Sequence, residues 1–213
     1  SSLGAVESIQ LVTTKPLEDI RKVALTSQSA TAVALLKTIF KLHLRKTVTY
    51  EELDGTADDA LGRSDGVLLI GDQGLEALYS PVPGTTCHDL GKIWQDWTDL
   101  PMVYAVWATR EDFARINGVE LRAVEEELVQ CMDYGREHLP AVVDSAAGCY
   151  PLDRSSLTRY FGLLHYGFGS EYQQGLRRFY ELAHQAGELP EVPQLRFIDE
   201  FTEYDVADAG ASP

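Results

Sequence analysis

Cysteine and long apolar runs are both scarce in this chain of 213 residues. Its three cysteines, Cys87, Cys131 and Cys149, show no CxxC spacing, which argues against a disulfide framework and a zinc site. We therefore expect reduced, mostly buried thiols, as in a cytoplasmic protein. No apolar run is long enough to cross a bilayer, and no signal peptide is visible.

Basic residues are also scarce, since 18 Lys and Arg face 33 Asp and Glu, for a formal net charge of −15. Such a surface repels nucleic acid and anionic lipid, so neither is an expected partner. The charge gives no long-range attraction to an anionic substrate either. A small anion would have to be held by local hydrogen-bond donors inside a cleft.

Motifs for bound cofactors are missing as well. The chain has neither a GxGxxG before a helix nor a GxxxxGK[ST], which disfavours nucleotide binding. Its five histidines are scattered, without metal-ligand or Ser/His/Asp spacing: His43, His88, His138, His165 and His184. We expect no metal and no cofactor. The sequence does not indicate an oligomeric state.

Short β-rich segments alternate with amphipathic helices through the first half of the chain. The expected strands are residues 8–13, 22–26, 47–50, 66–70 and 102–107. The expected helices are residues 30–42, 72–79 and 90–97. The segment 66–70, GVLLI, is apolar on both faces, as strands buried in a parallel sheet are. The alternation predicts an α/β fold with a parallel sheet covered on both sides.

The second half of the chain has helical periodicity. The expected helices are residues 120–138, 141–147, 154–161 and 170–186, with Gly187 as the cap of the last one. The acidic end, residues 190–213, is rich in Pro, Gly and Ala, and we expect it to be extended or disordered.

A division into two lobes follows from this order of elements. Residues 14–108 would form a second α/β lobe, while 1–13 and 109–189 would form the remainder of a first lobe with C-terminal helices. Strands 8–13 and 102–107 would be the two crossovers between them. Two crossovers make a hinged binding fold with the ligand in the cleft. Here the first lobe would be incomplete.

Hydroxyl groups are concentrated in the turn 26–31, TSQSAT, between a predicted strand and a predicted helix. Free N–H groups at a helix N-terminus attract anions, and the hydroxyls of Ser27, Ser29 and Thr31 add donors for one carboxylate. A plain helix cap explains the same residues, because Ser and Thr are favoured there. Both interpretations stay open.

Two further candidates lie at strand ends. Ser8 follows a small-residue turn and stands at the start of a strand, where its hydroxyl would face a cleft or form an ordinary strand edge. Gly71 and Asp72 follow the buried strand, and ligands of open α/β sheets gather at the carboxyl ends of strands. Gly71 would let a ligand approach the backbone. Asp72 would bind a hydroxyl or cap the next helix.

Five segments together resemble the chorismate dehydratase family of the futalosine pathway for menaquinone. They are 4–8 (GAVES), 23–37 (VALTSQSATAVALLK), 69–75 (LIGDQGL), 89–94 (DLGKIW) and 100–108 (LPMVYAVWA). The resemblance implies a two-lobe, type II periplasmic-binding-protein-like fold used as a cytoplasmic enzyme. It begins inside the family sequence, so most of the first lobe is expected to precede Ser1.

The resemblance also implies residue roles. Ser8 matches the serine that lies at the reacting part of the substrate, and is the expected catalytic residue. Ser27, Ser29 and Thr31 match a hydroxyl-rich turn that receives a substrate carboxylate. The implied activity is a hydro-lyase reaction that removes water from chorismate, a dicarboxylate, to give 3-[(1-carboxyvinyl)oxy]benzoate. The alternatives are a non-catalytic solute-binding protein for a small carboxylate and an α/β domain that binds a protein partner.

Overall fold

The computed structural model describes residues 1–150 and 152–198. It separates into two compact units, of which unit 1 comprises residues 1–105 and 143–192. Among the described residues, unit 2 comprises 106–142 and 193–198. The expected tail, 190–213, contains no helix or strand up to residue 198, and the rest of it lies outside the described residues.

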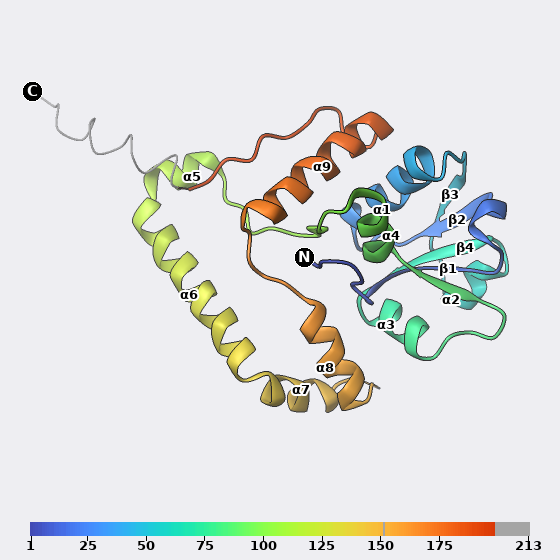
Figure 1. The fold of residues 1–213 in the computed structure, drawn as a ribbon, viewed down its shortest axis with the longest axis horizontal. Coiled ribbons are helices and arrows are strands. Elements are labelled where there is room, and N and C mark those ends of the chain that lie inside the picture. The colour runs from blue at the N-terminus through green and yellow to red at the C-terminus, as the bar shows by residue number, and fades with distance from the viewer. Residues whose placement is uncertain (151, 199–213) are drawn as a thin grey trace, which may run out of the picture. The chain divides into compact units, whose positions relative to one another are not determined.

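Unit 1 is built on a five-stranded mixed sheet with strand order β3-β2-β4-β1-β5 (Figure 1). These strands are β1 (Ile9–Thr13), β2 (Lys22–Leu25), β3 (Thr49–Glu52), β4 (Gly66–Ile70) and β5 (Thr86–Asp89). β2 runs parallel to β3 and β4, whereas β1 runs antiparallel to β4 and β5. The expectation of a parallel sheet is therefore wrong for β1, which lies in the same sheet as the predicted second lobe.

Burial explains why β1 and β4 occupy the middle of the sheet. All five residues of β1 are buried, and four of the five in β4 are. The two strands pair over their whole length, from Ile9 opposite Ile70 to Thr13 opposite Gly66. A strand that is buried on both faces is shielded from water most completely when it lies between two other strands.

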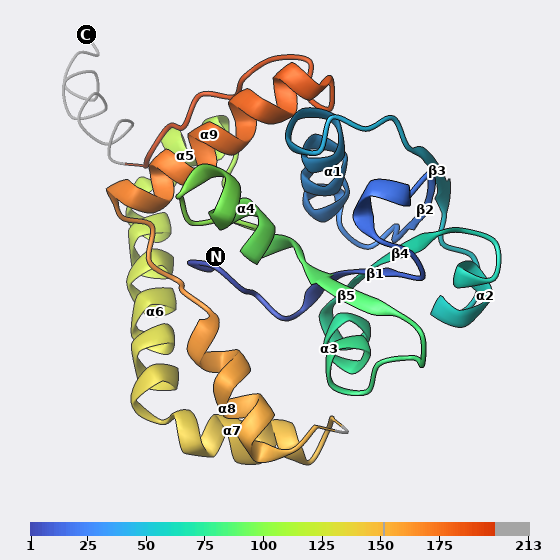
Figure 2. The ribbon, with the colours of Figure 1, turned by 45° about the vertical axis from the view of Figure 1, so that its right-hand side comes forward.

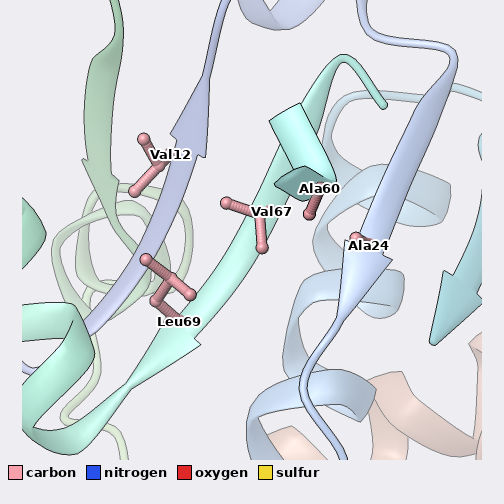
Figure 3. Close-up of a cluster of buried hydrophobic side chains, with 5 residues drawn as sticks. All are labelled: Val12, Ala24, Ala60, Val67 and Leu69. Carbon is pink, nitrogen blue, oxygen red and sulfur yellow. The ribbon is translucent and has the colours of Figure 1, made fainter. Parts of the chain in front are cut away.

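One face of the sheet is covered by α2 (Ala57–Leu61) and α3 (Gly71–Tyr79). The buried core on this face consists of five aliphatic side chains (Figure 3): Val12, Ala24, Ala60, Val67 and Leu69. They come from three strands and α2, so burial of this cluster fastens the helix to the middle of the sheet.

Helices α1 (Ala30–Thr38) and α4 (Leu90–Thr98) lie on the other side of the sheet from α3 (Figure 2). The π-helical turn η2 (Ile39–His43) continues α1, and α9 (Ser170–Ala186) packs against both. Trp94 of α4 is fully buried and meets Phe179 of α9 edge to face, with ring centroids 6.0 Å apart. The expected cap is confirmed, since Gly187 ends α9 with φ at 84°.

The remaining helices are α7 (Leu139–Ala147) and α8 (Arg154–Leu163), together with α5 (Glu111–Ile116) and α6 (Gly118–Glu137) of unit 2. No residue of α6 is buried. Several apolar side chains of α5 and α6 are exposed: Phe113, Ile116, Val119, Val124, Val129 and Tyr134. Unit 2 therefore buries little of its own apolar surface.

Three further features differ from the expectations. Residues 102–107 do not form a strand, since only Met102 pairs, in an isolated bridge with Ser2, and residues 105–110 are exposed. Strand β5, Thr86–Asp89, was not expected. Cys131 and Cys149 are exposed rather than buried, whereas Cys87 is half-buried.

Candidate functional site

The predicted site residues of unit 1 meet at one edge of the sheet. β2 and β4 are parallel, so their carboxyl ends share this edge, and the 26–31 turn and Gly71 follow them. β1 runs the other way and starts opposite the end of β4, with Ile9 paired to Ile70. Ser8, just before β1, therefore lies at the same edge as Gly71. Ser8 precedes its strand whereas Gly71 and the 26–31 turn follow theirs, and the reversed direction of β1 brings all three to the same edge.

The 26–31 turn caps helix α1. Ser29 is the N-cap residue, and its Oγ accepts a hydrogen bond from the Ala32 amide at 3.1 Å. Thr26 Oγ1 accepts from the Gln28 amide at 3.2 Å. Ser27 is exposed and Thr31 half-buried. The cap is thus real, and it leaves the Ser29 hydroxyl proton available for donation to a ligand.

Gly71 opens helix α3 in the left-handed region, with φ at 59°. An added Cβ there would meet nothing within 4 Å, so the space beside this backbone is open. Asp72 is exposed in the first turn of α3, and the N-cap residue, Ile70, provides no side-chain cap. Asp72 therefore does not act as the side-chain N-cap of α3, and its other predicted role, binding a ligand hydroxyl, stays a prediction.

The turn formed by residues 4–8, which carries Ser8, is held by a single carboxylate. Asp89 Oδ2 accepts hydrogen bonds from the amides of Val6 at 3.0 Å and Glu7 at 2.7 Å. The same carboxylate accepts from Gln10 Nε2 at 3.3 Å and, as N-cap of α4, from the Lys92 amide at 3.0 Å. Asp89 therefore ties the turn, strand β1 and helix α4 together.

Two glycines let helices lie directly against this turn. A Cβ on Gly74 of α3 would come within 2.5 Å of the Ser8 carbonyl oxygen. A Cβ on Gly91 of α4 would come within 2.5 Å of the Gly4 carbonyl oxygen. Both distances are too short for a side chain, so the backbone position of Ser8 depends on these two glycines.

The 100–108 segment completes the packing around the turn without forming a strand. Tyr104 Oη lies 3.0 Å from Ser2 Oγ, and Trp94 Nε1 donates to the Pro101 carbonyl at 3.2 Å. Burial raises the pKa of Tyr104 well above that of a free tyrosine. Sequence segments far apart in the chain thus converge on the residues before β1.

Glu7 is a buried carboxylate that the sequence analysis did not select. Its side chain is 2% exposed, and Glu7 adopts φ at 61°, which is unusual outside glycine. Glu7 Oε2 accepts a hydrogen bond from Tyr79 Oη at 2.7 Å, and Glu7 Oε1 lies 2.5 Å from Arg159 Nε. Burial, followed by the hydrogen bond to Glu7, raises the pKa of Tyr79 to about 12.

Helix α8 covers Ser8. The Tyr160 hydroxyl lies beside the Ser8 side chain, and Ser8 is only 7% exposed. Burial raises the pKa of Tyr160, and the neighbouring Ser8 hydroxyl offsets part of that rise. Tyr160 was not among the predicted site residues. A single sequence carries no signal that α8 packs on this turn.

The described residues contain no group of three or more His, Cys, Asp and Glu side chains that could hold a metal ion. In the same part of the chain, no helix combines the length and apolar character needed to span a membrane. His88 lies away from the edge, with Nε2 3.1 Å from Thr13 Oγ1, and burial lowers its pKa.

Comparison with known proteins places these features in a family. A family model described as menaquinone biosynthesis matches residues 1–185. A chorismate dehydratase from Thermus thermophilus is 32% identical over 196 residues, covering 84% of this chain and 69% of the relative.

Two solved structures share the fold at low sequence identity. A protein from Archaeoglobus fulgidus has a TM-score of 0.56 at 18% identity, covering 88% of this chain and 71% of its own. An ABC transporter from Parabacteroides distasonis has a TM-score of 0.50 at 17% identity, covering 92% and 74%. These two likenesses support a mixed α/β fold.

Proposed function

The chain belongs to the menaquinone biosynthesis family and is similar to the chorismate dehydratase of Thermus thermophilus, and from this premise we propose that it dehydrates chorismate. The product would be 3-[(1-carboxyvinyl)oxy]benzoate, and the enzyme would be a carbon–oxygen lyase of the cytoplasm. The two-lobe architecture with an incomplete first lobe, and the lobe boundaries predicted above, stay part of this proposal.

The proposed reaction is redox-neutral and needs no cofactor. The ring C3–H bond and the C4–OH bond break, and the C–H electron pair forms the double bond that makes the ring aromatic. The proton and the hydroxide leave together as water. Because aromatisation supplies the driving force, the protein has to position the substrate and stabilise developing charge.

The observation that carries this proposal is the meeting of Ser8 with the strand ends at one edge of the sheet. We assign one substrate carboxylate to Ser27, Ser29 and Thr31, with Gly71 and Asp72 lining the ring. Ser8 would donate a hydrogen bond to the leaving hydroxyl or to the second carboxylate.

Proton removal is assigned to the substrate's own enolpyruvyl carboxylate. The protein carboxylate beside Ser8 is Glu7, which is held between Arg159 and Tyr79. None of the five histidines was predicted to belong to the site, and His88 contacts Thr13 instead. The enolpyruvyl group is attached through its oxygen to ring C3, so its carboxylate can act as the base for the C3 proton.

The second candidate is a non-catalytic solute-binding protein for a small carboxylate. The likeness in fold to an ABC transporter protein from Parabacteroides distasonis favours it. This candidate predicts tight binding of a small anion without turnover.

Incubation with chorismate, followed by liquid chromatography and mass spectrometry, separates the two candidates. Loss of one water, with an aromatic enolpyruvyl ether as the product, is the result expected of the dehydratase. Unchanged chorismate in the presence of the folded protein would overturn the proposal and leave the solute-binding function.

A further inference from the structure

One face of helix α8 lies on the residues that surround Ser8. Ser156, Arg159 and Tyr160 are spaced i, i+3 and i+4, so they share a helix face. Ser156 lies beside Tyr79, Arg159 pairs with Glu7, and Tyr160 lies beside Ser8. A ligand that reaches the Ser8 hydroxyl therefore meets this face of α8.

The Arg159 guanidinium is fixed at one point and open elsewhere. Its Nε lies 2.5 Å from Glu7 Oε1, a carboxylate that is 2% exposed, yet the Arg159 side chain is 68% exposed. A guanidinium carries five N–H donors, and the contact with Glu7 is an ion pair on the Nε side of the group in which Oε1 accepts no hydrogen bond. The terminal donors form the planar fork that binds a carboxylate in two places.

Glu7 and Tyr79 set the orientation of this guanidinium. Tyr79 Oη donates to Glu7 Oε2 at 2.7 Å, whereas Glu7 Oε1 contacts the guanidinium as an ion pair and accepts no hydrogen bond. Glu7 is also held in a left-handed backbone conformation that costs on the order of 1–3 kcal/mol outside glycine. Contacts to the buried carboxylate thus fix a cation beside Ser8.

A substrate with two carboxylates needs such a cation. The chain has a net charge of −15, and the predicted donors Ser8, Ser27, Ser29 and Thr31 are neutral. Among the described contacts of Glu7 and Ser8, Arg159 is the one positively charged side chain. The hydroxyl turn accounts for one carboxylate and leaves the other without a charged partner.

We propose that Arg159 is a substrate-binding residue whose guanidinium receives the second carboxylate of the substrate, held in place by Glu7 and Tyr79. This inference rests on the proposed function, since it takes the substrate to be a dicarboxylate. It assigns the two carboxylates to separate parts of the site, one to the turn after β2 and one to α8.

Steady-state kinetics and calorimetric binding with chorismate test the proposal on the full chain. Arg159→Met is expected to raise KM and Kd by about 10- to 100-fold, as loss of a charged hydrogen bond does, with a smaller effect on kcat. Arg159→Lys should lie between it and the wild type. The matched control is Arg154→Met, on the same helix, 63% exposed and paired with Asp144, which should stay within about twofold.

The double variant Glu7→Gln/Arg159→Met separates binding from folding. Arg159→Met alone leaves a buried carboxylate without its cation, which is itself destabilising. The double variant removes both charges, so we expect a melting temperature near that of the wild type while KM and Kd stay raised. Recovery of wild-type KM and Kd in the double variant would overturn the proposal, because Arg159 would then only neutralise Glu7.

The two proposals fail in different ways. If the wild type binds chorismate without converting it, the dehydratase function is overturned, and the Kd values still decide the role of Arg159. If the wild type converts chorismate and the double variant has an unchanged KM, only the Arg159 proposal is overturned. If the wild type neither binds nor converts chorismate, both are overturned.

Discussion

The 4–8 turn and the 26–31 turn lie at the same edge of the sheet but are held by different kinds of contact. The first is buried, and its amides bond the Asp89 carboxylate while Gly74 and Gly91 bring helices against its carbonyls. The second depends on its own side chains, with Ser29 capping α1 and Ser27 exposed. One turn is fixed by the rest of unit 1, and the other is fixed locally.

This difference suggests how the proposed reaction divides its requirements. The group that contacts the reacting atoms has to be positioned closely, because small displacements reduce rate strongly. A group that only receives a carboxylate needs accessible donors rather than a rigid surround. The buried turn carries Ser8, and the exposed turn carries the hydroxyls assigned to the carboxylate. The first three of the four predictions that follow test this contrast.

The largest effect is expected for Asp89→Ala. This change leaves the amides of Val6, Glu7 and Lys92 without their acceptor, at a cost of about 3 kcal/mol or more in the free energy of unfolding. kcat should fall as well. The control is Thr56→Ala, which removes the N-cap of α2 and should cost about 1 kcal/mol without loss of activity.

Urea denaturation of both variants measures this contrast. Equal losses for Asp89→Ala and Thr56→Ala would mean that the carboxylate acts only as a helix cap. The 4–8 turn would then be held no more firmly than the 26–31 turn.

Ser8→Ala should act on rate rather than on stability. Removing one hydroxyl donor at the reacting centre is expected to lower kcat by roughly 100-fold. The control is Ser64→Ala, because Ser64 is also 7% exposed but donates to Glu51 Oε1 away from the edge. Full kcat in Ser8→Ala would remove Ser8 from the proposed mechanism.

Substitutions in the 26–31 turn should separate capping from binding. Ser29→Ala is expected to lower the free energy of unfolding by about 1 kcal/mol, because Ser29 caps α1. It should also raise KM, because the Ser29 hydroxyl is one of the donors assigned to the substrate carboxylate. Ser27→Ala should raise KM by about fivefold with no change in melting temperature, since Ser27 is exposed. An unchanged KM in both variants, measured at saturating and limiting chorismate, would leave this turn as a plain helix cap.

The smallest effect concerns pH and His88 of β5. Burial lowers its pKa in the folded state below the ordinary value of about 6.5, so the unfolded chain binds the proton first as pH falls. Its contribution to stability is present above pH 6.5 and is lost as pH falls through the folded pKa. Melting temperatures at pH 7.5 and 5.5 should therefore differ less in His88→Gln than in the wild type. An identical difference in both would contradict this sign.

The strands with strong apolar character could be predicted closely. Gly66–Ile70 occurs as expected, because a run that is apolar on both faces has few other places in a fold. Thr86–Asp89 was missed because a polar four-residue strand shows neither alternation nor an apolar run. Residues 102–107 are as apolar as a buried strand, but strands need partners, and only Met102 has one, Ser2.

The candidate site could be predicted only in part, for a similar reason. Residues that directly follow or precede strands could be selected, because sheet geometry brings such positions to common edges. The pairing of Glu7 with Arg159 connects the two sequence segments that form unit 1, and it depends on where α8 packs. The importance of Asp89 was visible only as a motif residue, since its acceptor role depends on the folded turn.

The reversed direction of β1 has a consequence for changes in chain length. β1 is hydrogen-bonded to β4 on one side and to β5 on the other, so it has no free edge along which to slide. An insertion or deletion within residues 4–8 would have to be absorbed by the turn itself, whose amides and carbonyls are already engaged. The exposed loop of residues 81–84, before β5, has no such constraint. We therefore expect homologous chains to vary in length there and to keep the length of the 4–8 turn constant.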